Sequence, residues 1–363
     1  MIMSYINTVN TFSHRKLSKK EIIELSKFNS DLKKLRESKD KICRICGKKI
    51  NGYCQSHSIP SFVLKSIANN GKVRVGTTFQ SMRINVSNGV KNTLNFYSVC
   101  KKCDSEYFQN YEHEDLLHKK LTDVAINEIA IKSYIRYLYK QENEFIRYKE
   151  LLDNKKNIIE EEKQFYENIL FLSKCNMIDT KYRIDKYINK KNEKNFYVID
   201  EIDLEYKTEL AYQGFITIVY GFDGIINDIY NYDLKYKMQQ LGVCVYPHKS
   251  GTKILLYCED GLSRMKKFYK HYRELDLERK LYVINYLILL YEEEWVVGDS
   301  FTKKLNKETL LLINQHDTII QGSSVRDGFL SLNYLADAIK DTFILKDTGN
   351  IYNFLAKHWA SAL

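Results

Sequence analysis

The segment that decides the fold runs from Cys43-Arg-Ile-Cys46 to Cys100-Lys-Lys-Cys103, with Gln55-Ser56-His57-Ser58-Ile59-Pro60 between the two pairs. Two Cys-x2-Cys pairs separated by one loop have the spacing of a tetrahedral Zn²⁺ site made of four thiolates. The alternative is a set of unconnected buried thiols. The spacing predicts one structural zinc ion that holds His57 on a rigid hairpin.

Two further polar residues follow the histidine within this segment. Asn95 stands five residues before Cys100, and Asp104 directly follows Cys103. The order Cys-x2-Cys, Ser-His-x-x-Pro, Asn-x4-Cys-x2-Cys-Asp resembles the zinc-supported form of the HNH (ββα-metal) endonucleases. The resemblance covers residues 40–115, about a fifth of the chain.

The resemblance implies a role for each polar residue. His57 would be the general base, Asn95 would brace the active-site loop, and Asp104 would bind a catalytic Mg²⁺ or Mn²⁺ ion. Ser56 departs from the family pattern because it stands where a metal-binding carboxylate is usual, and a hydroxyl is a poor ligand for a hard cation. Glu112 is a supplementary candidate ligand if one helix carries both Asp104 and Glu112.

Each of these residues also has a structural alternative. His57 could cap the turn before Pro60, and Asn95 could be an ordinary turn residue. Asp104 could be the N-cap of the helix that follows it. Glu112 could be a solvated helix carboxylate.

The residue types suit phosphodiester hydrolysis. A neutral imidazole, with an unperturbed pKa of about 6.5, can take a proton from water at physiological pH. A divalent ion on Asp104 would stabilise the charge that develops on the scissile phosphate and the leaving oxygen. The resemblance implies products with 5′-phosphate and 3′-hydroxyl ends.

Positive charge is concentrated in the part of the chain that carries this motif. Residues 1–123 hold 22 Lys and Arg against 11 Asp and Glu, a net charge of +11. Residues 124–363 hold 34 against 35, a net charge of −1. Because a basic surface binds polyphosphates by releasing counterions, nucleic acid is the expected partner and double-stranded DNA the expected substrate. The alternative is a lysine-rich surface that is merely solubilising.

A β-hairpin is expected between the histidine and Asn95. From Gly71 onward apolar residues alternate with polar ones, which is typical of strands. Lys72, Arg74 and Arg83 on this hairpin are candidate phosphate contacts, and exposed strand charges without a partner are the alternative.

Three parts are expected along the chain. Residues 1–123 would form a basic HNH-like zinc and nuclease domain, which opens with an amphipathic helix over residues 18–38. Residues 124–180 would form a helical connector, because their apolar stripe contains no Pro or Gly, and two long antiparallel helices would turn near Asp153. Residues 181–363 would form an accessory domain.

The accessory domain is expected to mix helices and strands. Four segments are strand-like, and helical patterns follow them: 197–202, 210–220, 242–246 and 253–258. The predicted fold class is therefore α+β, with a ββα-metal module, a long helical hairpin and a small antiparallel sheet in the last part.

No membrane contact is expected. The longest apolar stretch, residues 282–291, is far shorter than the roughly 20 residues that a bilayer span needs. The N-terminus lacks the pattern of a secretory leader. Reduced, metal-bound thiols favour the cytoplasm as the compartment.

Two functions from different classes follow from the motif. The first is a metal-dependent HNH-type endonuclease, a hydrolase of DNA whose last part senses a trigger, binds an activating partner or ligand, or selects the substrate. By analogy, this arrangement is that of bacterial anti-phage defence effectors. The second is a catalytically inactive, zinc-stabilised adaptor that binds nucleic acid, which Ser56 favours.

Overall fold

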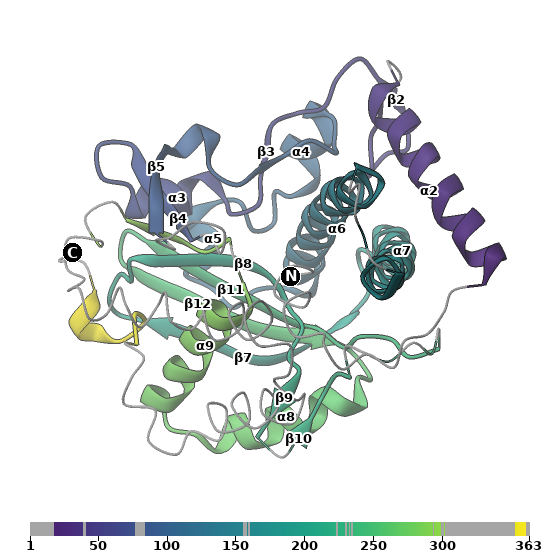
Figure 1. Cartoon of the computed structure of the whole chain (residues 1–363). Coiled ribbons are helices and arrows are strands. Elements are labelled where there is room, and N and C mark those ends of the chain that lie inside the picture. Colours follow the sequence, from purple (N-terminus) through teal and green to yellow (C-terminus); the bar gives the residue numbers. More distant parts are fainter. Residues whose placement is uncertain are drawn as a thin grey trace.

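A seven-stranded antiparallel sheet organises the protein (Figure 1). The computed structural model describes residues 18–38, 41–76, 84–154, 160–222, 224–228, 235–292, 294–298 and 353–360, with the single residues 158, 231, 233 and 301. The strands of the sheet are β4 (Lys72–Gly76), β5 (Ile84–Gly89), β7 (Phe196–Leu204), β8 (Leu210–Ile216), β11 (Leu241–His248), β12 (Gly251–Glu259) and β13 (Val296–Gly298). Their order in space is β5-β4-β13-β8-β11-β12-β7.

The central strands are buried on both faces of the sheet. In β11, Cys244 and Tyr246 belong to one hydrophobic cluster, and Val243 and Val245 belong to the other. Because successive side chains of a strand point to opposite faces, a strand covered on both sides needs apolar residues at every position. The sequence from Leu241 to Tyr246 meets this requirement. All four segments expected to form strands contain one, although the strand in segment 210–220, β8, ends at Ile216.

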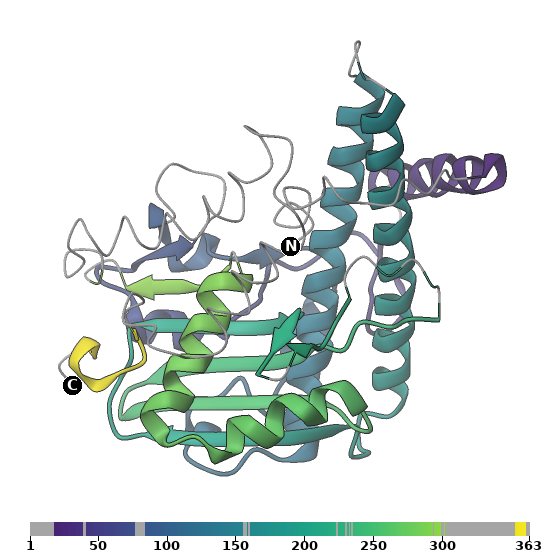
Figure 2. The ribbon, with the colours of Figure 1, turned by 60° about the horizontal axis from the view of Figure 1, so that its bottom comes forward.

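Helices cover the two faces of the sheet (Figure 2). One face carries α8 (Ser263–Glu274) and α9 (Leu277–Tyr291), which contact β7 and β8 respectively. The other face carries α3 (Ser61–Ile67) and α6 (Asp123–Asn154). The ring of Tyr134 on α6 stacks on that of Phe215 on β8, with centroids 4.1 Å apart. The mixed α+β class is therefore confirmed.

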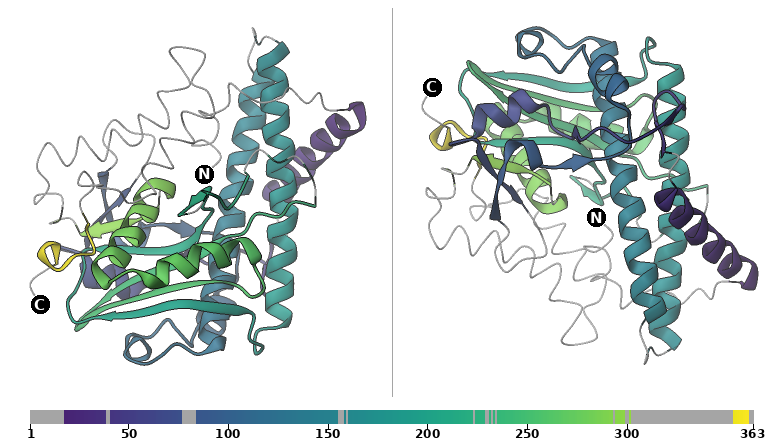
Figure 3. Two further views of the ribbon diagram at one scale, coloured as in Figure 1. Left: turned by 90° about the horizontal axis from the view of Figure 1, so that it is seen from below. Right: turned by 90° about the horizontal axis from the view of Figure 1, so that it is seen from above.

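A long helical hairpin lies beside the sheet, as the sequence predicts. Helix α6 ends at Asn154, and α7 (Glu160–Asn189) returns along it (Figure 3). Arg183 of α7 pairs with Glu259 at the end of β12, and the Tyr134 hydroxyl donates to the same carboxylate at 2.7 Å. This buried pair fixes the hairpin to the sheet.

The basic helix expected near the N-terminus is α2 (Lys19–Glu37), and it packs against both helices of the hairpin. Its start is set by a capping box, in which the Ser18 hydroxyl accepts from the backbone of Glu21 and the Glu21 carboxylate accepts from that of Ser18. No helix in the described part of the chain is long and apolar enough to cross a bilayer.

The hairpin expected after Gly71 is β4–β5, and it joins the large sheet. Strand β13 bridges the two groups of strands, because Val296 pairs with Val75 of β4 and with Ala211 of β8. The sheet is therefore larger than the small one expected, since residues far apart in sequence complete it. The boundaries at 123/124 and 180/181 stay predictions. Residues 302–350, where further helices were expected, lie outside the described residues.

The remaining described elements are short. They are β1 (Lys41–Ile42), β2 (Lys49–Ile50), β3 (Ser56–His57), η1 (Val90–Asn92), β6 (Asn95–Phe96), α4 (Lys101–Tyr107), α5 (Glu114–Leu117), β9 (Tyr220–Gly221), β10 (Gly224–Ile225) and η3 (Lys357–Trp359). Most of them lie in the segment between the cysteine pairs or next to it.

The contact between the β4–β5 hairpin and β13 predicts a sensitive glycine. A Cβ on Gly76 would lie 2.2 Å from Cε2 of Trp295, which is fully buried. We expect Gly76→Ala to lower the free energy of unfolding by about 1–3 kcal/mol because of this overpacking. Urea denaturation measures the loss. Gly89→Ala, on the paired strand with open space at its Cβ, is the control and should change stability little. Equal stability of the two variants would contradict the tight contact.

Candidate metal centre and catalytic residues

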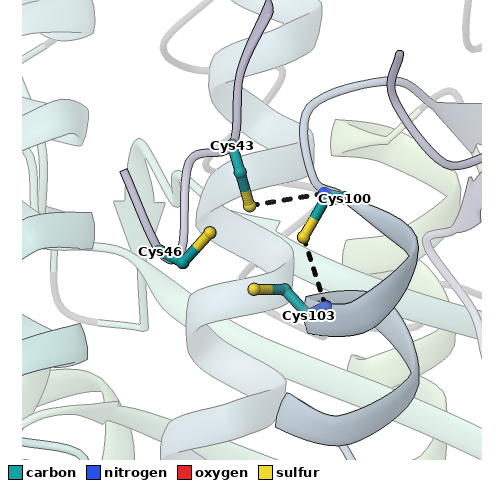
Figure 4. A group of neighbouring side chains, drawn as sticks. All are labelled: Cys43, Cys46, Cys100 and Cys103. Carbon is teal, nitrogen blue, oxygen red and sulfur yellow. Dashed lines mark hydrogen bonds between the residues drawn. The ribbon is translucent and has the colours of Figure 1, made fainter. Parts of the chain in front are cut away.

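The four cysteines of the two pairs converge on one point (Figure 4). Their Sγ atoms all lie within 4.8 Å of one another, so they could hold a metal ion. In a tetrahedral zinc site with Zn–S bonds of about 2.3 Å, the sulfur atoms are about 3.8 Å apart. The geometry is therefore that of a four-thiolate site, consistent with the structural zinc that the spacing predicts.

Short elements bring these cysteines together. Cys43 and Cys46 lie in the turn between β1 and β2, where Gly47 has a φ of +67° that favours glycine. Cys100 is the N-cap of α4, and its Sγ accepts from the backbone N–H of Cys103 at 3.4 Å. The Cys43 Sγ accepts from the backbone N–H of Cys100 at 3.3 Å. These bonds help to orient the Sγ atoms of Cys43 and Cys100.

Burial and mutual proximity affect how these thiols ionise. Burial raises the pKa of Cys43, and burial together with a hydrogen bond to Cys100 raises the pKa of Cys103. The protonated thiols of Cys43 and Cys103 are therefore favoured, and binding of a metal ion to them would release protons.

Two short strands and a helix lie around His57, although α3, β4, β5 and η1 come between the two strands in the sequence. Strand β3 pairs antiparallel with β6, with Ser56 opposite Phe96 and His57 opposite Asn95. Helix α4 follows β6 directly and starts at the second cysteine pair. The four cysteines therefore link the start of α4 to the hairpin β1–β2. Strands β3 and β6 lie between the hairpin and α4 in the sequence.

His57 has one ring nitrogen fixed by a backbone carbonyl. Its Nε2 lies 3.1 Å from the carbonyl oxygen of Val90 in η1. Since a carbonyl oxygen only accepts, Nε2 carries the proton, and Nδ1 is left as the basic nitrogen. Burial, assisted by the positive charges of Lys132 and Lys65, lowers the pKa of His57. Burial and these charges therefore favour the neutral form of the ring.

Asn95 holds the turn that contacts His57. Its Nδ2 donates to the carbonyl oxygen of Lys91 at 2.8 Å, and Gln55 donates to the same oxygen at 3.2 Å. The Oδ1 atom of Asn95 is buried and has no partner among the described residues. Asn95 and His57 thus both contact the turn that begins at Val90.

Asp104 lies one turn inside α4 and faces β3. Its Oδ1 accepts from the Ser56 hydroxyl at 2.6 Å, and its Oδ2 accepts from the Cys54 thiol at 3.4 Å. The alternative in which Asp104 caps the helix is wrong, because Cys100 occupies the N-cap. The structure therefore brings Ser56 and Asp104 together although they are 48 residues apart.

Glu112 does not share a helix with Asp104, so that part of the sequence interpretation is wrong. Helix α4 ends at Tyr107, and the backbone N–H of Asn110 donates to the Glu128 carboxylate at 2.9 Å instead of continuing the helix. Burial raises the pKa of Glu112. Glu112 and Asp104 form ion pairs with the same cation.

That shared cation is Lys132 of α6, which the sequence interpretation missed. Its Nζ pairs with Glu112 and lies 3.4 Å from Oδ1 of Asp104, and the side chain is 2% exposed. The signal in the sequence is a lysine inside the apolar run Ile129-Ala-Ile-Lys-Ser-Tyr-Ile135. A lysine on an apolar stripe is buried only if it is paired.

The residues around Asp104 do not fit a catalytic divalent ion as they are arranged. Oδ1 accepts from Ser56 and forms an ion pair with Lys132, and Oδ2 accepts from Cys54. A hard cation needs several oxygen ligands, and here an ammonium group takes the charge-compensating position. The expected Mg²⁺ or Mn²⁺ ion thus stays a prediction without support from the donor set.

The hairpin residues expected to contact phosphate lie in different surroundings. Lys72 is exposed at the start of β4, next to Gly71, whose carbonyl accepts from the backbone N–H of Val90 at 3.1 Å. Arg74 is half-buried within the sheet, paired with Val297 of β13. Arg83 lies outside the described residues. Lys65 on α3 is exposed and acts electrostatically on His57, and the sequence interpretation missed it.

The cysteine cluster predicts one zinc ion per chain. We expect Cys100→Ser to lose the metal and to unfold β1, β2 and α4, because two-residue strands have no stability of their own. Inductively coupled plasma mass spectrometry measures the zinc content. Cys175→Ser, on α7 outside the cluster, is the control and should keep its zinc. Wild-type protein purified without chelator and still free of zinc would contradict the prediction.

Comparison with protein-family models, with curated proteins and with solved structures finds no match to this chain.

Proposed function

We propose that the protein hydrolyses phosphodiester bonds of nucleic acid, with His57 as the general base. The observation that carries the proposal is the hydrogen bond from Nε2 of His57 to Val90 O, which leaves Nδ1 as the basic nitrogen. The pairing of β3 with β6 and the helix α4 that follows β6 support the resemblance to the ββα-metal endonucleases.

The proposed reaction uses the neutral form of the histidine. Nδ1 takes a proton from water while the water oxygen attacks phosphorus, and the bond from phosphorus to the leaving oxygen breaks. The leaving oxygen takes a proton from solvent. In the resemblance this route yields a 5′-phosphate and a 3′-hydroxyl end. Asn95 supports the chemistry indirectly by holding the turn that contains the Val90 carbonyl.

The substrate class follows from charge. The net charge of +11 on residues 1–123 attracts a polyanion toward the part of the chain that contains His57. We propose that exposed Lys65 on α3, which acts electrostatically on His57, and exposed Lys72 on β4 contact phosphates of the substrate. Double-stranded DNA is the substrate that we propose.

A second candidate function is binding without cleavage. Ser56 in place of a carboxylate and the ion pair of Asp104 with Lys132 both favour an inactive, zinc-stabilised adaptor. Such an adaptor would keep the charge and the cysteine cluster but would not need the His57 tautomer. Cleavage of nucleic acid separates the two candidates.

The wider role of the protein is proposed by analogy. An accessory region larger than the nuclease region suits an effector that responds to a trigger or an activating partner, as in anti-phage defence. The eight cysteines are free thiols, which suits a reducing compartment such as the cytoplasm.

Replacing the histidine tests the catalytic proposal. We expect His57→Ala to lower the rate of plasmid cleavage by about 10²–10⁴-fold, because the general base is lost, while zinc content stays the same. His113→Ala, an exposed histidine in the same segment, is the control. Because a general base works in its neutral form and the pKa of His57 is lowered, the rate should be flat near pH 7 and fall only below about pH 6.5. Wild-type protein that binds DNA but never cleaves it would favour the adaptor.

Replacing one exposed lysine tests the nucleic-acid site. We expect Lys72→Ala to weaken DNA binding and to reduce the slope of log K against log salt by about 1, because one phosphate contact is lost. Fluorescence anisotropy at several salt concentrations measures both quantities. Lys267→Ala, an exposed lysine on α8, is the matched control. Equal effects of the two substitutions would count against a site on the hairpin.

A further inference from the structure

We propose that the ammonium group of Lys132 occupies the position expected for the divalent cation at Asp104, so that the site holds a cation supplied by the protein in place of a metal ion. The inference rests on the proposed function, because it concerns the charge that assists His57. It predicts that the wild-type chain holds no divalent ion between Asp104 and Glu112.

The first argument is the burial of Lys132. Its side chain is 2% exposed and lies on the apolar stripe of α6, between Ile129 and Ile135, which are both buried. Moving an ammonium group out of water is costly, and it stays charged only where carboxylates compensate it. The position of Nζ is therefore set by its partners and not by solvent.

The second argument is the convergence of the partners. Asp104 comes from α4 and Glu112 from the turn after α4, and both carboxylates contact the same ammonium group. The ring of Phe108 lies 4.5 Å from Nζ and adds a cation–π contact. Two carboxylates and an aromatic face from one short segment thus surround a single cation from another helix.

The third argument is the link to the catalytic histidine. Oδ1 of Asp104 forms an ion pair with Lys132 and accepts from the Ser56 hydroxyl, and Ser56 precedes His57 on β3. The serine completes the hydrogen bonding of Asp104 but adds no negative charge. A carboxylate at this position would leave the cluster short of a cation, so the serine and the lysine compensate each other.

The fourth argument is the competition between two cations for one oxygen. A metal ion bound to Oδ1 of Asp104 would share that atom with the ammonium group, and the two positive charges would repel each other. Two carboxylates and one ammonium leave a single negative charge, which is little for a divalent ion. Removal of the ammonium charge would leave two facing carboxylates, the ligand type that Mn²⁺ prefers.

Binding of Mn²⁺ tests the inference directly. Electron paramagnetic resonance would count Mn²⁺ ions bound to the zinc-loaded full chain for the wild type, Lys132→Gln and Lys132→Gln with Asp104→Asn. We expect no specific Mn²⁺ ion in the wild type, one in Lys132→Gln, and none in the double variant. Lys132→Arg keeps the charge and should match the wild type.

A matched control removes another buried pair. Lys191 pairs with the buried carboxylate of Glu128 at 2.5 Å, and Lys191→Gln should create no Mn²⁺ site. Two results would overturn the inference. One is a wild-type chain that binds one Mn²⁺ ion and loses it on Asp104→Asn substitution. The other is a folded Lys132→Gln variant that gains no Mn²⁺ site. If Lys132→Gln fails to fold, the comparison of wild type with Asp104→Asn still decides.

Cleavage assays keep this inference separate from the proposed function. With EDTA present and zinc content verified in the same sample, we expect wild-type cleavage to persist. If cleavage strictly requires Mg²⁺ and Mn²⁺ binds at Asp104, the proposal that Lys132 occupies the cation position is wrong. The nuclease proposal would then still stand. An absence of cleavage under every condition would remove the nuclease proposal, and the Mn²⁺ counts would still report on Lys132.

Discussion

The convergence of two cysteine pairs on one point is the constraint on which the candidate site depends. Cys43 and Cys100 are 57 residues apart, yet the backbone of one donates to the sulfur of the other. Strands β1, β2, β3 and β6 have two residues each, and α4 has seven. Elements of this length do not persist in water without further restraint. A metal ion held by four thiolates would supply the restraint that a hydrophobic core supplies elsewhere.

Helix α6 supplies the second restraint through charges buried one turn apart. Glu128 accepts from the backbone and side chain of Asn110, and Lys132 pairs with Glu112. Both contacts fall on the segment that follows α4, so this segment is fixed by electrostatics from a rigid helix. Each pair would be costly if it were broken, because a charge would remain buried without a partner.

The sequence allowed much of the fold to be predicted, and the reasons are local. Strands β11 and β12 are continuous apolar runs, α6 and α7 show an uninterrupted apolar stripe, and the cysteine spacing indicates a metal centre. The bridging strand β13 has only three residues, Val-Val-Gly, and no local pattern says that it lies between β4 and β8. Lys132 escaped prediction for a similar reason, because its partners lie 20 and 28 residues away and periodicity carries no information about them.

Because β13 bridges β4 and β8, the segment around His57 cannot be separated from the large sheet without breaking strand pairs. The backbone N–H of Gly76 on β4 donates to the Trp295 carbonyl next to β13. The Gly71 carbonyl beside β4 accepts from Val90, and the Val90 carbonyl fixes the proton on His57. A piece of the chain cut after residue 123 would expose an unpaired strand edge, which invites pairing with other chains. The described setting of the histidine therefore depends on residues as far along the chain as β13, which ends at Gly298, so the two ends of the described chain form one structural unit.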